Sequence, residues 1–188
     1  MQISIPIPTH LQLHGGGFEA GFFHPVLGFD HLLAMVAVGI ISTLIGGRAI
    51  YLVPFSFVAV MIVGSLFGVY TSFALYDEFG IALSVILLGL LIAFEYKTSL
   101  VWSSVLVTFF AFFHGHAHGV EIPNASSIMN YITGFMLATI LLHILGVFIG
   151  IMSQKTNTGI TFLSHIGSAM VGIGIYIFYL LLQKSSLF

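Results

Sequence analysis

Six long apolar stretches constrain the fold of this chain more than any other feature of its sequence. They cover about residues 24–46, 50–74, 81–95, 99–118, 128–152 and 160–182, and short segments rich in Gly, Pro or charge separate them. A helix needs roughly 20 apolar residues to cross a bilayer, and fewer if neighbours cover its ends. The pattern predicts an all-α membrane protein: a six-transmembrane-helix bundle formed by residues 24–188 as one domain, with residues 1–23 as an extracytoplasmic arm.

The charges between the spans predict how the bundle is oriented. If the spans alternate in direction, Arg48, Lys97 and Lys155 lie on one side of the membrane. The opposite side receives the acidic residues Glu19, Asp77, Glu78 and Glu121. Because basic loops mark the cytoplasmic side, we expect both termini outside. We also expect Asp77 and Glu78 to lie in a solvated loop.

The scarcity of charge and the absence of cysteine exclude several classes of function. Only four residues are Lys or Arg, too few for the basic surface that binds nucleic acid. Without cysteine there are no disulfides, thiolate metal sites or thiol nucleophiles. Nine histidines stand beside four basic and six acidic side chains, so the polar chemistry of the chain is mainly that of histidine.

The segment "HPVLGFDH", residues 24–31, places two histidines near the outer end of the first span. Pro25 suits the first turn of a helix, and His24 and His31 are then nearly two helical turns apart. We therefore expect both imidazoles to project from one face of one helix. Asp30, next to His31, can ligate a metal directly or orient the imidazole through its second nitrogen.

The segment "FFHGHAHGVEIP", residues 112–123, places three more histidines at the outer end of the fourth span. In a helix, His114 and His118 share one face and His116 points to the opposite side. A broken backbone, which Gly115 and Gly119 permit, would align all three instead. The two clusters meet at one depth and predict a metal site made of His24, Asp30, His31, His114, His116 and His118.

Six further polar residues are candidates for accessory or pathway roles: His10, His14, Glu95, Glu121, His143 and His165. His143 and His165 lie in different spans at a similar depth, about 10–14 Å from the inner face. We expect them to form a second site below the first. Glu95, near the inner end of the third span, would be the next polar group along such a path.

Imidazole and carboxylate ligands without thiolate suit Ni²⁺, Co²⁺, Zn²⁺ or Cu²⁺ better than Mg²⁺ or Ca²⁺. Two classes of function fit such a site in a membrane. A transporter spreads its ligands along the membrane normal, whereas a membrane-embedded metal-dependent hydrolase holds one fixed metal with an open position for water. The outer cluster fits either class, and the deeper histidines favour transport. No Walker-type phosphate loop is present, so transport would depend on a gradient or on partners.

The two histidine segments also resemble a known family. "GFFHPVLGFDHLLAMVAVG" and "FFHGHAHGVEIP", together with "GGRAIYLVPFSFV" and "GIALSVILLGL", closely resemble the HupE/UreJ family of bacterial nickel permeases, from Gly15 onward. The resemblance implies a multi-pass protein of the bacterial inner membrane that takes up Ni²⁺, or Co²⁺, for metalloenzymes such as hydrogenase or urease. We therefore expect a permease and not an enzyme, with the metal as substrate and no organic cofactor.

The resemblance also carries site residues onto this chain. The first-helix motif of the family matches His24, Asp30 and His31. Its histidine-rich motif matches the second cluster, namely His114, His116, His118 and Glu121. The expected partners are a divalent transition metal ion and the lipid bilayer, and the ligand chemistry leaves Zn²⁺ as an alternative substrate.

Overall fold

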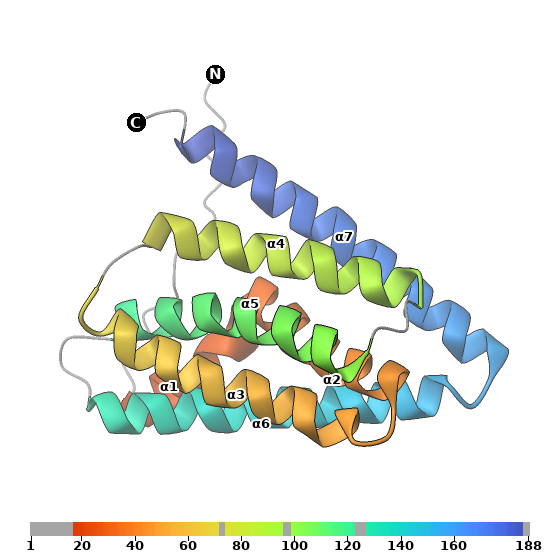
Figure 1. The fold of residues 1–188 in the computed structure, drawn as a ribbon. Helices are drawn as coiled ribbons and strands as arrows, with labels where there is room; N and C mark the ends of the chain where they lie inside the picture. Colours follow the sequence, from red (N-terminus) through yellow and green to blue (C-terminus); the bar gives the residue numbers. More distant parts are fainter. Residues whose placement is uncertain (1–16, 72–73, 96–98, 123–126, 186–188) are drawn as a thin grey trace.

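The computed structural model describes residues 17–71, 74–95, 99–122 and 127–185, which form seven α-helices and no strand (Figure 1). The helices are α1 (Gly17–Leu27), α2 (Phe29–Ile45), α3 (Ala49–Gly68), α4 (Ala74–Ala93), α5 (Leu100–Val120), α6 (Ile128–Ser153) and α7 (Asn157–Ser185). Among the described helices, α3 to α7 are each long and apolar enough to cross a membrane, and α1 with α2 meets the same criteria when the bent pair is taken as one span. The predicted all-α membrane bundle is confirmed. The side on which the termini lie stays a prediction.

The first span differs from the expected straight helix. It consists of α1 and α2, which meet at an angle of 77°. Gly28 between them has an extended backbone, with φ −73° and ψ 103°. Pro25 lies inside α1, where it removes a helical hydrogen bond and weakens the helix just before the bend. The prediction that His24 and His31 share one helix face is therefore wrong, because they stand on two helices.

Glycine contacts hold α3 against α5. A Cβ at Gly64 or Gly68 of α3 would collide with carbonyl oxygens of α5. The reverse holds for Gly115 and Gly119 of α5, whose added Cβ atoms would collide with carbonyl oxygens of α3. Small residues at such spacing allow the backbones of membrane helices to approach closely. The glycines of the histidine segment thus serve helix packing, and α5 continues unbroken past them to Val120.

A second set of glycines holds both halves of the first span against α6. Gly21 of α1 faces the backbone of α6 next to Gly134, and Gly39 of α2 faces the backbone next to Gly146. No side chain fits at any of these four positions without a shift of backbone. The bent span is therefore fixed at two points, one on each side of the bend.

Helix α2 lies at the centre of the bundle and carries the longest run of buried residues, from Ala37 to Thr43. It contacts α3, α4 and α6. Figure 1 shows α4 and α7 side by side along one side of the molecule, with α6 on the other side. The start of α2 and the end of α5 meet inside this arrangement, so the histidines that they carry are enclosed by helices.

Candidate metal site

Three histidines from three helices form the centre of the site. His24 stands on α1, His31 on α2 and His118 on α5, and one ring nitrogen of each lies within 4.8 Å of the other two. The ring centroids of His24 and His118 are 4.7 Å apart, and those of His31 and His118 are 5.0 Å apart. Imidazole nitrogens bind transition metals at about 2.0–2.1 Å, so small rotations of these rings would close them around one ion.

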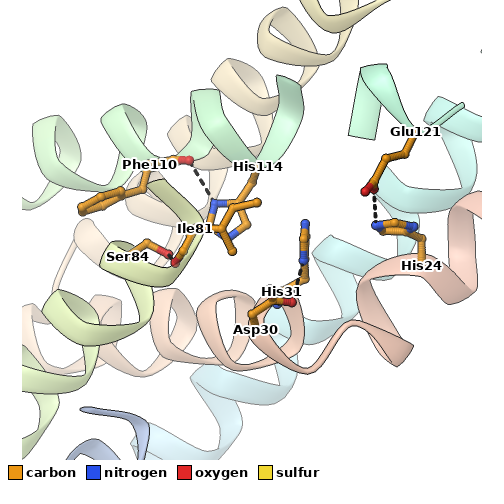
Figure 2. A network of polar contacts seen from close by, with 8 residues as sticks. All are labelled: His24, Asp30, His31, Ile81, Ser84, Phe110, His114 and Glu121. Carbon is orange, nitrogen blue, oxygen red and sulfur yellow. Dashed lines mark hydrogen bonds and ion pairs between the residues drawn. The ribbon is translucent and has the colours of Figure 1, made fainter. Parts of the chain in front are cut away.

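His114 extends this group by one helical turn of α5. Its ring centroid lies 5.2 Å from that of His31, and the two side chains face each other in Figure 2. The Nδ1 of His114 donates to the carbonyl oxygen of Phe110 over 2.9 Å. That bond fixes the tautomer and leaves the lone pair on Nε2 for a metal.

Asp30 orients His31. One Asp30 oxygen, Oδ1, accepts hydrogen bonds from the backbone N–H of His31 at 2.8 Å and from its ring Nδ1 at 2.9 Å. A carboxylate only accepts, so Nδ1 carries the hydrogen and Nε2 keeps its lone pair. Of the two roles open to Asp30, the structure shows the orienting one. A carboxylate in this position also raises the basicity of the ligand.

Glu121 marks the accessible end of the site. It directly follows α5, and its Oε2 lies 2.9 Å from Nε2 of His24 (Figure 2). The side chain of Glu121 is 32% exposed and that of His24 is 17% exposed, whereas His114 and His118 are fully buried. Solvent therefore reaches the group of histidines at Glu121 and does not reach it at His114.

Several ring nitrogens of this group lack a hydrogen bond. In the described part of the chain, no partner is present for Nε2 of His31, Nε2 of His114 or either ring nitrogen of His118. The ring of His118 stacks on Phe135 at 4.5 Å instead. Buried polar atoms without partners are costly and uncommon. A metal bound by His24, His31 and His118 would supply the missing partner for the last two rings, so the donor set fits an imidazole-binding transition metal ion.

His116 lies on the opposite face of α5, as predicted for a continuous helix through this segment. It therefore lies apart from the other histidines. Its Nδ1 donates to Oδ2 of Asp77 over 2.7 Å, and its Nε2 lies 2.7 Å from Oγ1 of Thr71. Both ring nitrogens of His116 therefore have partners within the protein, and neither is directed toward the other histidines.

Asp77 is a residue whose role sequence reasoning missed. The expectation of a solvated loop is wrong, because Asp77 lies in the first turn of α4 and is only 3% exposed. The ion pair with His116 compensates its burial. The sequence feature that could have indicated its burial is its position within one helical turn of a long apolar run.

Phe57 is a second residue that sequence reasoning missed. It contacts two of the histidines, but it is one of 19 phenylalanines, and nothing in the sequence distinguishes it from the others.

The deeper histidines are not brought together. His143 on α6 is 2% exposed, and its ring contacts Phe57. His165 on α7 is exposed, because α7 contacts mainly α4 and leaves its other faces uncovered. Glu95, just after α4, is also exposed. The predicted pairing of His143 with His165 is therefore absent from the structure. His10 and His14 lie outside the described residues.

Comparison with known proteins decides what kind of protein carries this site. The model of the family described as HupE / UreJ protein matches residues 1–177. The chain belongs to the HupE/UreJ family. A curated relative, Protein HupE of Rhizobium leguminosarum bv. viciae, is 45% identical over 139 residues, which cover 74% of this chain and 73% of the relative. No solved structure matches.

Membership of the HupE/UreJ family confirms the resemblance seen in the sequence. This HupE/UreJ chain is a multi-pass inner-membrane protein of the nickel/cobalt permease type. The geometry adds which side chains of the chain converge. Four imidazoles from α1, α2 and α5 adjoin one another, and Asp30 and Glu121 each contact one of them.

Proposed function

We propose that this protein takes up Ni²⁺, with Co²⁺ as a second substrate, through a site formed by His24, His31, His114 and His118. The observation that supports the proposal most directly is the convergence of these four imidazoles in the interior of a membrane bundle, where His31, His114 and His118 each have a ring nitrogen without a hydrogen-bond partner among the described residues. Ionisable groups at such depth are costly and mark ion pathways. The chain has no cysteine thiolate to bind Cu⁺, so its imidazole ligands favour divalent ions such as Ni²⁺ and Co²⁺.

The histidines are arranged as overlapping ligand sets. His31 has ring contacts with His24, His118 and His114, at centroid distances between 5.0 and 5.4 Å. An ion held by His24, His31 and His118 can gain His114 before it releases His24. Such stepwise exchange avoids a state in which the metal has lost both its water and its ligands, which would be very costly in a medium of low dielectric constant.

Glu121 and Asp30 have different parts in this proposal. Glu121, at the exposed end, attracts the hydrated cation and releases His24 as the metal arrives. Asp30 stays hydrogen-bonded to His31 and offsets part of the charge of the buried ion. Two acidic groups near a divalent cation lower the cost of removing it from water.

The direction of transport follows from the orientation that we propose, with both termini outside. Arg48 lies between α2 and α3 and Lys155 between α6 and α7, both at the end of the bundle opposite Glu121. Basic residues favour the cytoplasmic side. Glu121 and the open end of the site would then face the outside, and His143 would lie further along the path inward.

Uptake into sealed proteoliposomes tests the proposed function. The purified full chain is reconstituted, and entry of Ni²⁺, Co²⁺ and Zn²⁺ is followed with an entrapped chelating dye. We expect time-dependent entry of Ni²⁺ and Co²⁺ that His31→Ala abolishes. Tight binding of Ni²⁺ without accumulation in the vesicles would contradict a permease and would favour a fixed metal site.

A further inference from the structure

His143 is a buried histidine that the outer site does not use. It is 2% exposed, and neither of its ring nitrogens has a hydrogen-bond partner in the described part of the chain. The end of α6 and the start of α5 lie at the same end of the bundle. His143 is ten residues, or about 15 Å, from the end of α6, and His114 is about 21 Å from the start of α5. His143 is therefore the deeper of the two.

The ring of Phe57 contacts both His143 and the innermost histidine of the outer site. Phe57 is fully buried. Its ring centroid lies 5.6 Å from that of His114 and 5.2 Å from that of His143, with interplanar angles of 62° and 89°. Phe57 thus contacts both the innermost imidazole of the outer group and the unused imidazole. It offers no ligand atom and excludes water from the space that it fills.

The backbone below Phe57 is weaker than in a regular helix. Pro54, three residues earlier in α3, donates no hydrogen bond to the preceding turn. The hydroxyl of Ser56 also donates to the carbonyl oxygen of Val53 at 2.8 Å, a local bond that competes with the backbone hydrogen bonds of the helix. Helix kinks occur at such positions, so a shift of the Phe57 ring meets less resistance here than in an intact helix.

From this geometry we infer that Phe57 is the gate of the path, and that an ion passes from His114 to His143 only when the Phe57 ring turns aside. The inference rests on the proposed function. The gate keeps hydrated ions and water at the outer site, and His143 receives the metal once the gate has opened. Hydrophobic constrictions control permeation in this way in channels, and movement of a gate sets the rate of many multistep processes.

Variants that change the volume at position 57 test the inference. Nickel uptake into sealed proteoliposomes and nickel affinity in detergent are measured for Phe57→Ala, Phe57→Trp and His143→Ala. The control is Leu163→Ala, which creates a cavity at a fully buried position on α7, a helix that carries none of the outer-site histidines and not His143. If Phe57→Ala is recovered unfolded, Phe57→Leu takes its place, since it removes the ring and keeps most of the volume.

The expected results separate gating from packing. All three test variants should bind nickel within about twofold of the unmodified protein, because the outer ligands remain. Phe57→Ala should raise the uptake rate per molecule about threefold or more, while Phe57→Trp and His143→Ala should lower it about tenfold. The Leu163→Ala protein should change neither quantity beyond about twofold.

Failure of the inference can be told apart from failure of the proposed function. If the unmodified protein transports nickel and His31→Ala does not, but the Phe57 variants behave like Leu163→Ala or all slow uptake alike, Phe57 is only a packing residue. If the unmodified protein binds nickel and never accumulates it, the permease proposal fails and the gate fails with it.

Discussion

The ring of His31 on α2 lies 5.0 Å from the ring of His118 on α5, and Nε2 of each lacks a hydrogen-bond partner in the described part of the protein. Removing either ring should therefore remove a metal ligand. We expect His31→Ala and His118→Ala each to weaken nickel binding by more than about 100-fold, the upper end of what loss of an orienting partner costs. Isothermal titration in detergent measures this. Near-normal affinity in both variants would show that the metal binds elsewhere.

Asp30 should act through His31 and not as an independent ligand. The variant Asp30→Asn keeps a hydrogen-bond acceptor next to Nδ1 of His31 but removes the negative charge. We expect nickel affinity to fall about 10- to 100-fold, as for other partners that orient a ligand. The double variant Asp30→Asn with His31→Ala should lose less affinity than the sum of the two single losses. An additive loss in the double variant would show that Asp30 binds the metal itself.

The His116–Asp77 pair should contribute to stability and not to metal binding. Both side chains are buried, and together they join α5 to α4. His116→Ala leaves Asp77 buried without its partner, which costs about 3–5 kcal/mol for a buried ion pair. Thermal unfolding in detergent should show this loss, with nickel affinity within about twofold of the unmodified protein.

A double replacement provides the control for that prediction. Changing both His116 and Asp77 to Leu removes the unpaired charge, so most of the stability should return. If His116→Ala instead lowers nickel affinity as strongly as His118→Ala does, His116 reaches the metal in a conformation other than the one described here.

The glycines of the histidine segment should tolerate no side chain. A methyl group at Gly115 would collide with the carbonyl oxygen of Met61, so we expect Gly115→Ala to destabilise the protein by about 1–3 kcal/mol, as overpacking does. Gly172 on α7 is the matched control, because nothing lies within 4 Å of an added Cβ there. Gly172→Ala should leave the unfolding temperature equal or higher. Equal behaviour of the two variants would contradict the close contact between α3 and α5.

Much of the fold could be predicted from the sequence because apolar length determines where helices cross a membrane. The spacing of Gly64 and Gly68 is also typical of close packing between membrane helices, and both residues lie against α5. The bend at Gly28 could not be predicted, because Pro25 suits either the first turn of a helix or a weak point within one. Its position depends on the contacts of α1 and α2 with α6.

The positions of site residues could be predicted where they depend on spacing within one helix. They could not be predicted where they depend on packing between helices. The spacing placed His114 and His118 on one face of α5, and the structure agrees. Depth along a span did not reveal which way His165 faces, since depth contains no information on rotation about the helix axis. The burial of Asp77 depends on a partner on another helix, which no local pattern could supply.

Nickel K-edge X-ray absorption of the loaded protein tests the proposed histidine ligands, because the scattering from imidazole rings counts the histidines bound to the metal. We predict a nickel ion with several imidazole ligands and no sulfur ligand in the unmodified protein. His118→Ala should lose one imidazole, and His116→Ala should leave the spectrum unchanged. A spectrum of water and carboxylate oxygens alone, or one that His116→Ala alters and His118→Ala does not, would contradict the proposed site.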